Sequence, residues 1–462
     1  MRYFMDSQRE VVLPLYNQHN PNDPITILSD VAIEINSGQA TGNAEIIFEF
    51  LPIPRAVMNV TIVTGFVNPM PGSLTINCPA IGLVSNAKLI NCILRGGEDK
   101  PLEQRLKVSE FISQISYNND HDDMVKYVIF HLPNMRNFIC MDSDSSLDIA
   151  HSYEENGLVQ SRLLGNAVMF AGGWRIQINA LLNTNDIENK LQNTSGYALT
   201  HVGRIEREDG ELFSNQLIPS IIEAISMYLS YIRGIWICPL LIVGCDENNN
   251  KIWESWDRGR LDLWRMVPTF FDVHNANMLW EVFPGFWKLW NDPEWKSVIK
   301  DAIYWYVTAN MGSRGTDVGL IIAQCALELI GWHYFIALNN CKTVLEKTPE
   351  EYEKIKSGDK IRLFLDNIGI PTKMHSKLEK LQRLANRMNW RGGPRVIIEM
   401  RNDLVHSKKH IKRNFSNEIN ECWQLAQYYV ELVLLRLFEC KGKYRDRITG
   451  GWDGQVSDVP WI

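Results

Sequence analysis

One segment of the chain has the residues needed to cleave a phosphodiester. Arg401, Asn402 and His406 lie within six residues, R-N-D-L-V-H, and supply a permanent cation, a polar amide and a group that titrates near neutral pH. Cleavage of RNA without a metal needs a base for the 2′-hydroxyl proton, an acid for the leaving 5′-oxygen and a cation for the charged transition state. His406 could act as the acid or the base, and Arg401 as the cation.

The spacing of these residues limits how they could meet. On a helix, at about 100° per residue, Asn402 and His406 share a face, whereas Arg401 and His406 lie about 140° apart. We therefore expect one of three arrangements: Arg401 reaches around the helix, the helix breaks near His406, or a second subunit completes the site. An arginine followed by a histidine at this spacing is common by chance, so the pattern is evidence for function only together with the sequence around it.

A basic segment surrounds this pattern. The whole chain has 47 basic and 54 acidic residues and a net charge of −7, but residues 371–413 contain twelve basic and three acidic residues, a charge of +9. Helical spacing predicts a basic stripe formed by Lys373, Lys377, Lys380, Arg387 and Arg391, and four further cations follow the histidine: Lys408, Lys409, Lys412 and Arg413. We interpret this charge as a track for RNA phosphates; the alternative is an ordinary solvated helix face.

The elements that carry these residues are predicted to be helical. After Asp292-Pro293-Glu294 the strand signals stop, and Pro at the first helical position favours a helix start. We expect helices over residues 293–310, 317–339, 349–356, 359–367, 373–390, 396–406 and 416–439. Thr348 and Glu351 form a capping-box pattern. This half of the chain is therefore predicted to be an all-α bundle.

The first half of the chain has the alternating pattern of antiparallel strands. We expect strands over residues 31–35, 45–50, 59–67, 126–132, 167–181 and 235–244, with one helix over 214–232. The predicted fold is α+β and multidomain, with a β-rich, sandwich-like N-terminal half before the bundle. The expected domains are 1–205, a Trp-rich α/β connecting region 206–290, the helical domain 291–440 and an irregular tail 441–462.

Nine of the 15 tryptophans lie between Trp236 and Trp305. Large aromatic rings mostly fill cores and domain interfaces, although a row of them could also stack nucleic-acid bases. We expect this cluster to be packing.

The sequence lacks the signature motifs of several functional classes. No P-loop, G-x-G-x-x-G or G-x-S-x-G pattern occurs, and nine scattered cysteines without a C-x-x-C pair fit neither a zinc site nor a disulfide framework. We therefore expect no cofactor, no metal and a reducing, cytoplasmic location. Residues 318–338 are long enough to span a membrane, but Gln324, Glu328 and His333 would lie inside it, so a buried helix is favoured over a membrane partner.

The R-N-x-x-x-H pattern on a late helix of an all-α bundle resembles the signature of the HEPN superfamily of helical nucleotide-binding and ribonuclease domains. The segment A-L-E-L-I, Ala326 to Ile330, resembles the acidic position that many members carry, and the lysines after the histidine are also family-like. The resemblance covers about residues 293–440. A β-rich half before such a domain resembles ApeA-type abortive-infection proteins, in layout only.

The resemblance implies a four-helix core and a homodimer, formed through the helical domain, that brings two motifs together. It implies a metal-independent endoribonuclease that leaves 2′,3′-cyclic phosphate ends, with Arg401 and His406 catalytic, Asn402 orienting and Glu328 a supporting acid. Glu328 has an equal structural interpretation, as a carboxylate that pairs with Arg401 or caps a helix. The implied substrate is RNA, with tRNA one candidate, and the implied setting is anti-phage or stress defence with a phage-derived or nucleotide trigger at the N-terminal half. The alternative is a non-catalytic nucleotide- or RNA-binding protein that uses the bundle to dimerise.

Overall fold

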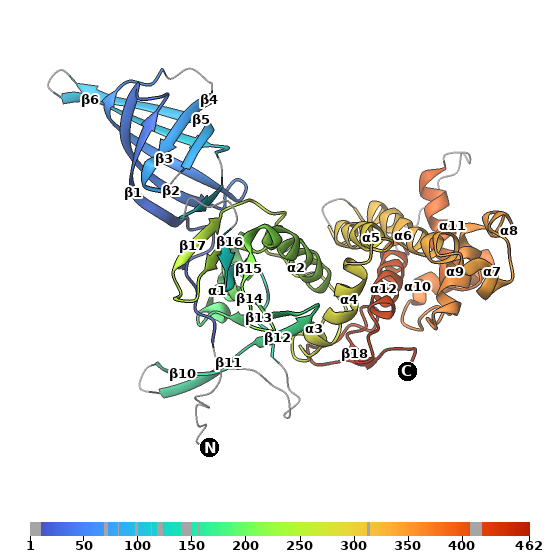
Figure 1. Ribbon diagram of the computed structural model, residues 1–462. Coiled ribbons are helices and arrows are strands. Elements are labelled where there is room, and N and C mark those ends of the chain that lie inside the picture. Colours follow the sequence, from blue (N-terminus) through green and yellow to red (C-terminus); the bar gives the residue numbers. More distant parts are fainter. Residues whose placement is uncertain are drawn as a thin grey trace.

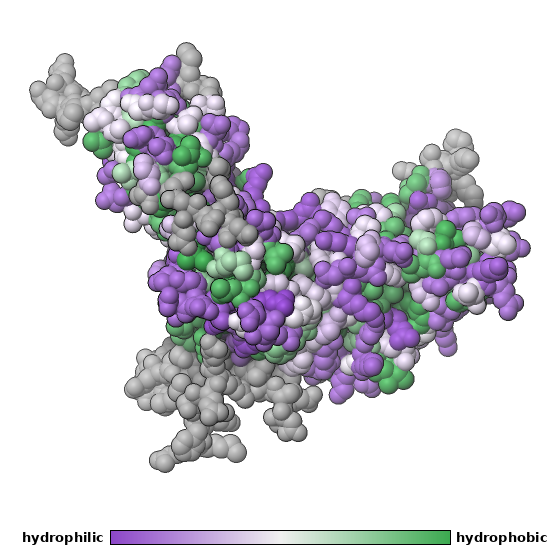
Figure 2. Space-filling view, in the orientation of Figure 1, coloured by the Kyte–Doolittle hydropathy of each residue, from purple (hydrophilic) through white to green (hydrophobic). Residues whose placement is uncertain are grey.

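The computed structural model describes residues 11–68, 73–81, 83–97, 100–111, 113–117, 123–139, 149–155, 158–311, 315–406 and 418–462. Three parts follow one another in space: a small β-barrel, a sheet domain in the middle and a helical domain at the other end (Figure 1). Hydrophilic residues cover most of the visible face of the helical domain, interrupted by smaller hydrophobic areas (Figure 2). The predicted α+β multidomain class, β-rich first and helical second, is confirmed.

The first part is a closed barrel with strand order β1-β2-β3-β6-β5-β4. Its strands are β1 (Ile25–Ile35), β2 (Ala40–Glu49), β3 (Arg55–Gly65), β4 (Ser73–Cys78), β5 (Leu83–Gly97) and β6 (Lys100–Ser109). β1 pairs with both β2 and β4, so the sheet closes on itself and these strands have no free edge. The sandwich-like arrangement expected here is therefore corrected to a barrel; alternating burial fits both arrangements, because each buries one face of every strand.

The middle part is a seven-stranded antiparallel sheet with the order β12-β13-β14-β9-β16-β17-β7. Its strands are β7 (Gln114–Ser116), β9 (Tyr127–Pro133), β12 (Asn166–Ala171), β13 (Trp174–Ala180), β14 (Leu199–Arg207), β16 (Leu240–Cys245) and β17 (Lys251–Ser255). Around it lie β8 (Met124–Val125), β10 (Ile149–Glu155), β11 (Leu158–Leu164), α1 (Thr184–Thr194), β15 (Phe213–Ser214) and α2 (Ile218–Arg233). The adjacent strands β9 and β16 are buried on both faces, so their sequences are largely apolar.

The two faces of this sheet belong to different cores. Val128, Phe130 and Leu132 of β9 pack into a core that continues through α2 into the helical domain. Ile129 of the same strand, together with Val243 of β16, belongs to the core shared with the barrel. The sheet therefore joins the barrel to the helices through alternate side chains of the same strands.

The helical domain contains every helix expected after residue 291, with bounds that differ from the expected ones by up to six residues when the π-helical turn is counted with the helix before it. Its elements are α3 (Met278–Glu281), α4 (Phe283–Trp290), α5 (Lys296–Ala309), α6 (Thr316–Trp332), a π-helical turn (His333–Ala337), α7 (Asn340–Leu345), α8 (Pro349–Glu353), α9 (Ser357–Asn367), α10 (Glu379–Met388), α11 (Gly393–Val405) and α12 (Ile419–Leu437), followed by β18 (Lys443–Tyr444) and β19 (Ser457–Asp458). The capping box at Thr348 is confirmed, with Glu351 N donating to Thr348 Oγ1 at 3.2 Å and Thr348 N donating to Glu351 Oε2 at 2.8 Å.

The tryptophan cluster is packing, as expected. Six of its members are buried: Trp236, Trp253, Trp256, Trp264, Trp290 and Trp295. The other three are half-buried against the core: Trp280, Trp287 and Trp305. These rings fill the sheet domain and its junction with the helices.

Among the described residues, one stretch, Thr316–Ala337, is long and apolar enough to cross a membrane. It comprises α6 and the π-helical turn, and half of its most apolar window is buried inside the protein. Figure 1 places α6 within the bundle, and Ala323, Leu327 and Ile330 are fully buried there. This is the packing of a core helix of a folded domain.

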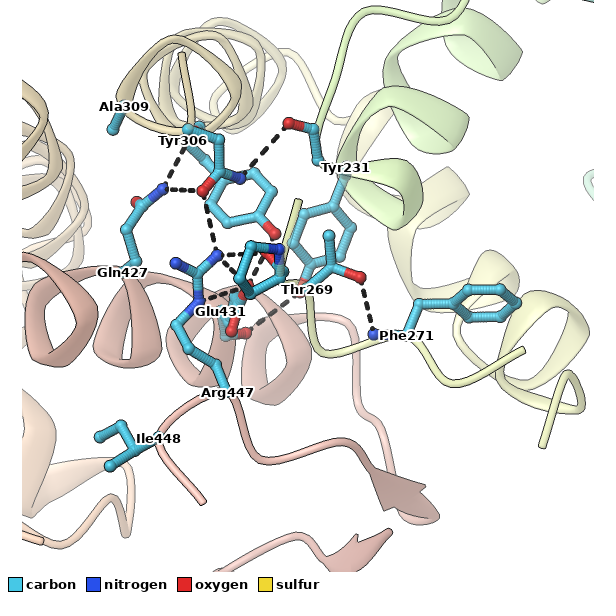
Figure 3. A network of polar contacts seen from close by, with 12 residues as sticks. Tyr231, Thr269, Phe271, Tyr306, Ala309, Gln427, Glu431, Arg447 and Ile448 are labelled. Carbon is cyan, nitrogen blue, oxygen red and sulfur yellow. Dashed lines mark hydrogen bonds and ion pairs between the residues drawn. The ribbon is translucent and has the colours of Figure 1, made fainter. Parts of the chain in front are cut away.

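A buried polar network joins the C-terminal tail to three other elements (Figure 3). The Arg447 and Glu431 side chains are 0% and 1% exposed and form an ion pair of 2.9 Å. Tyr306 Oη of α5 donates to Glu431 Oε1 at 2.7 Å, and Tyr231 Oη of α2 donates to the Glu431 carbonyl at 3.1 Å. Arg447 Nη2 also donates to the Pro268 carbonyl at 2.7 Å. The tail, predicted to be an irregular extension, is thus anchored in the interior.

Arg447→Met should destabilise the protein strongly, because it leaves the Glu431 carboxylate buried without its cation. We expect a loss of about 3–5 kcal/mol in the free energy of unfolding, measured by urea denaturation. The double variant Glu431→Leu/Arg447→Met should lose less than the single variant. The matched control is Lys288→Met, whose exposed pair with Glu439 spans 2.8 Å and should contribute almost nothing. An Arg447→Met protein as stable as this control would contradict the prediction.

Candidate functional site

The helix that carries Arg401 and Asn402 ends immediately before His406. α11 stops at Val405, and His406 has an extended backbone, with φ −99° and ψ 106°. The His406 amide donates to the Asn402 carbonyl at 2.9 Å, and its side chain is exposed. Of the three arrangements expected from the sequence, the helix break near His406 is the one observed in the chain.

A polar cavity of about 470 Å³ lies between α6, α9 and α11. It is lined by Gln324, Glu328, Lys356, Ser357, Gly358, Arg395, Ile398, Glu399, Arg401 and Asn402. The structure therefore brings together three of the four predicted catalytic residues: Glu328, Arg401 and Asn402. His406 is not part of the lining, so a single chain does not place the histidine in the cavity.

The guanidinium of Arg401 is half-buried and only partly bonded. Its Nη1 donates to Asn402 Oδ1 at 3.2 Å, while its buried Nε has no hydrogen-bond partner in the described part of the chain. Burial raises the pKa of the Cys325 thiol, Glu328 raises it further and Arg401 lowers it, so both charges lie near this thiol. No ion pair joins Arg401 to Glu328 among the described residues. The buried Nε donor thus has no partner within the described part of the protein, although the guanidinium as a whole is only half-buried.

The start of α9 adds positive potential to the same cavity. Ser357 and Gly358 are its first residues and no side chain caps this end, while the amides of Asp359 and Lys360 bond back to the Lys356 carbonyl. The free amides at a helix start and the helix dipole both favour an anion. With Lys356 and Arg401 beside them, these groups form a site suited to phosphate.

Gln324 is a residue of this cavity that sequence reasoning missed. It is 1% exposed, and its Oε1 has no hydrogen-bond partner among the residues described. Gln324 precedes Glu328 by one turn of α6, so both point to the same side of the helix. The sequence contains a signal that could have identified Gln324 as a site residue: a glutamine one turn before an acidic residue in an otherwise apolar helix. From the sequence alone, Gln324 served only as an argument against a membrane span.

The basic stripe is only partly helical, which corrects the expectation of a helix over 373–390. α10 begins at Glu379, because a turn precedes it in which the Lys377 amide donates to His375 Nδ1 at 3.2 Å. Lys380 and Arg387 therefore lie on α10, whereas Lys373, Lys377 and Arg391 flank it. All five side chains are exposed. The other predicted RNA-binding residues, Lys408, Lys409, Lys412 and Arg413, lie outside the described residues.

In the described ranges, no group of three or more His, Cys, Asp or Glu side chains is arranged to hold a metal ion. Eight described cysteines are free. Burial raises the pKa of Cys78 and of Cys238 to about 11, which disfavours the reactive thiolate form of both.

Comparison with known proteins places two matches on this chain. Residues 292–458 match the YopA C-terminal domain, and residues 120–267 match the YopA central domain. The chain is 26% identical over 278 residues to the SPbeta prophage-derived uncharacterized protein YopA of Bacillus subtilis (strain 168), an alignment that covers 60% of this chain and 60% of that relative. No solved structure matches the chain.

Inorganic phosphate should bind the Arg401 cavity and raise the melting temperature of the protein. Arg401→Ala should increase the phosphate Kd roughly tenfold or more, because a charge-assisted hydrogen bond contributes about 1.5–3 kcal/mol. Differential scanning fluorimetry with phosphate, against chloride at equal ionic strength, measures this. Arg362→Ala is the matched control, since Arg362 lies on α9 but pairs with Asp359 and Asp366 outside the cavity. Equal phosphate binding by both variants would contradict the assignment.

Proposed function

We propose that the helical domain is a HEPN-type, metal-independent endoribonuclease and that the Arg401 cavity holds the scissile phosphate. The observation that carries the proposal is the position of the half-buried Arg401 guanidinium beside the uncapped start of α9 in one polar cavity. An RNA phosphate would satisfy both sets of donors. The resemblance of the R-N-x-x-x-H segment to the HEPN signature supports the same residues.

The proposed reaction is an internal transesterification. The 2′-oxygen attacks phosphorus and loses its proton to a base, while the P–O5′ bond breaks and an acid protonates the leaving 5′-oxygen, giving a 2′,3′-cyclic phosphate and a 5′-hydroxyl. Arg401 stabilises the charge that develops on the phosphoryl oxygens, and Asn402 orients Arg401 through the Nη1–Oδ1 bond. His406 transfers one of the two protons. Glu328 lies in the same cavity and is the supporting acid of the proposal.

A homodimer completes this site. His406 is exposed at the end of α11, and it does not line the cavity of its own chain. In the proposed dimer, formed through the helical domain, His406 of each chain acts at the Arg401 cavity of the other. This arrangement uses the exposed position of the histidine at the helix end and the half-buried position of the arginine five residues earlier.

The proposed setting is the bacterial cytoplasm, in anti-phage, abortive-infection or stress defence. Similarity to a prophage-derived protein supports a phage-related context, and the free cysteines fit a reducing compartment. The substrate is RNA, with tRNA as one candidate, and the N-terminal half would respond to a phage-derived or nucleotide trigger.

The second candidate function is RNA or nucleotide binding without cleavage. The position of His406 outside the cavity lining favours it, because the phosphate site of each chain then lacks the histidine that the cleavage mechanism uses for proton transfer. Purified protein that binds labelled RNA tightly and leaves it intact, with and without phage lysate as the trigger, would support this second function.

His406→Ala and Arg401→Ala should each reduce RNA cleavage by a factor of about 10²–10⁴, because each removes a proton-transfer or charge-stabilising group. Cleavage of labelled total RNA, with and without EDTA, is the measurement, and EDTA should have no effect. Arg362→Ala is the control for loss of a surface arginine. Full activity in both site variants would contradict the ribonuclease proposal.

Mixing the two inactive variants tests the composite site. In a heterodimer of Arg401→Ala with His406→Ala, one of the two sites keeps both its arginine and its histidine. Random mixing should therefore restore about a quarter of the wild-type activity, since half of the dimers have one intact site of two. Activity that stays at the level of the separate variants would place both groups of a working site in one chain.

The exposed cations on α10 should strengthen RNA binding by neutralising phosphates. Lys380→Ala/Arg387→Ala should reduce the slope of log Kd against log salt concentration by about 0.7 for each phosphate of single-stranded RNA that the variant no longer neutralises. Fluorescence anisotropy across a salt series measures this slope. Lys190→Ala is the control, since Lys190 lies on α1 in the sheet domain. An unchanged slope would show that the cations on α10 do not contact RNA phosphates and belong to an ordinary solvated helix face.

A further inference from the structure

A second cavity lies where the sheet domain meets the helical domain, and no residue of it belongs to the Arg401 cavity. Its volume is about 470 Å³, within the usual range for small-molecule sites. α2 contributes Ile222 and Met227 to the lining, β17 contributes Trp253, and α5 contributes Tyr304. A ligand in this cavity would therefore touch both domains at once.

The interior of this cavity is apolar, and the polar groups within it are already bonded. Ser226 Oγ donates to the Ile237 carbonyl at 2.7 Å, Ser255 Oγ donates to Asp257 Oδ2 at 3.2 Å, and Cys238 Sγ donates to the Pro239 carbonyl at 3.3 Å. A nucleobase placed here would find few partners for its polar edges and would lose its bonds to water. The interior therefore fits a hydrocarbon body.

The mouth of the cavity presents a fixed cation. The Arg260 guanidinium lies 4.6 Å from the centre of the Trp236 ring and 4.9 Å from the centre of the Tyr304 ring. Two aromatic contacts orient its plane, and among the described residues no acid pairs with it. Gly259 lets the loop approach Cys238 closely, because a Cβ at this position would overlap the Cys238 sulfur. The loop thus holds Arg258 and Arg260 at the mouth.

Two of the three acidic residues that line the cavity already have partners. Glu223 pairs with Lys300, and Asp257 accepts hydrogen bonds from Ser113 and Ser255. Asp301 is the remaining acid of the lining, and it is exposed to solvent. The three basic residues of the lining, Arg258, Arg260 and Lys300, therefore balance its three acids in formal charge. Arg260 is nevertheless a cation that no acid pairs with among the described residues, and it is held at the mouth by the two rings.

We propose that this cavity binds an amphipathic monocarboxylate, with its apolar chain against α2 and Trp253 and its carboxylate on Arg260 and Arg258. A planar guanidinium held by two rings is preorganised for bidentate contact with a carboxylate. The ligand bridges α2 and α5, so its binding stabilises the contact between the sheet domain and the helical domain. This site is independent of RNA cleavage.

Decanoate, below its micelle concentration, is the probe, and the full-length chain is the protein. Isothermal titration calorimetry should show saturable binding, with decan-1-ol at least about tenfold weaker because it lacks the charge. Arg258→Ala/Arg260→Ala should raise the decanoate Kd about tenfold and leave the decan-1-ol Kd unchanged. Ile222→Trp should block both probes by filling the cavity. Arg383→Ala, which removes an exposed arginine of α10 paired with Glu379, is the control.

Near-ultraviolet circular dichroism verifies that each variant is folded before its binding is interpreted. If Ile222→Trp does not fold, Arg258→Ala/Arg260→Ala still tests the proposal. Both of these arginines are exposed, so their replacement should not disturb the fold. Three results would each overturn the proposal. The first is equal affinity for decanoate and decan-1-ol, and the second is the lack of saturable decanoate binding to the wild-type protein. The third is tighter binding of AMP than of decanoate.

Discussion

The buried ion pair between Arg447 and Glu431 connects the C-terminal tail to the helical domain and, through the hydrogen bond from Tyr231, to the sheet domain. Glu431 belongs to α12, and Arg447 belongs to the tail that follows it. Through Tyr306 and Tyr231 the same acidic residue is linked to α5 and α2. Burial raises the pKa of Glu431, while Arg447 and Tyr306 oppose that shift and favour the charged form. Such a pair tolerates little displacement, because any separation leaves a charge in the interior.

This constraint fixes the position of the helical domain against the sheet domain. α2 covers one face of the sheet, and its Tyr231 lies in the network; α5 begins the helical domain, and its Tyr306 lies there too. The same two helices both contribute side chains to the lining of the apolar cavity. The polar network and the apolar cavity are therefore two parts of one junction, one closed by hydrogen bonds and one left open to a ligand.

The Arg401 cavity depends on a different arrangement, the packing of α6 against α9 and α11. α6 belongs to the stretch that is apolar enough to cross a membrane. Its side chains Gln324 and Glu328 are polar, and they line the cavity together with the start of α9 and residues of α11. The free helix start of α9 and the guanidinium of Arg401 meet only because these three helices pack together. The cavity is polar because α6 departs from its apolar pattern at these two positions.

Local patterns were enough to predict many of the elements. The helices of the second half, the capping box at Thr348 and the burial of the tryptophans follow from periodicity, caps and ring size, which act over a few residues. The predicted start of α10 was wrong because the bond between the Lys377 amide and His375 is a turn contact that helix periodicity does not reveal. Barrel closure also escaped prediction, because the pairing of β1 with β4 joins strands that are far apart in sequence.

By itself, then, the sequence determined that a β-rich half precedes a helical half, and it singled out Arg401, Asn402, His406 and Glu328 as residues with chemistry. Only the tertiary structure decided which of them share a cavity, that Gln324 and the start of α9 belong with them, and that His406 lies outside. The physical reason is that a cavity is formed by side chains from separate helices, and its contents follow from packing over long sequence distances rather than from spacing along one helix.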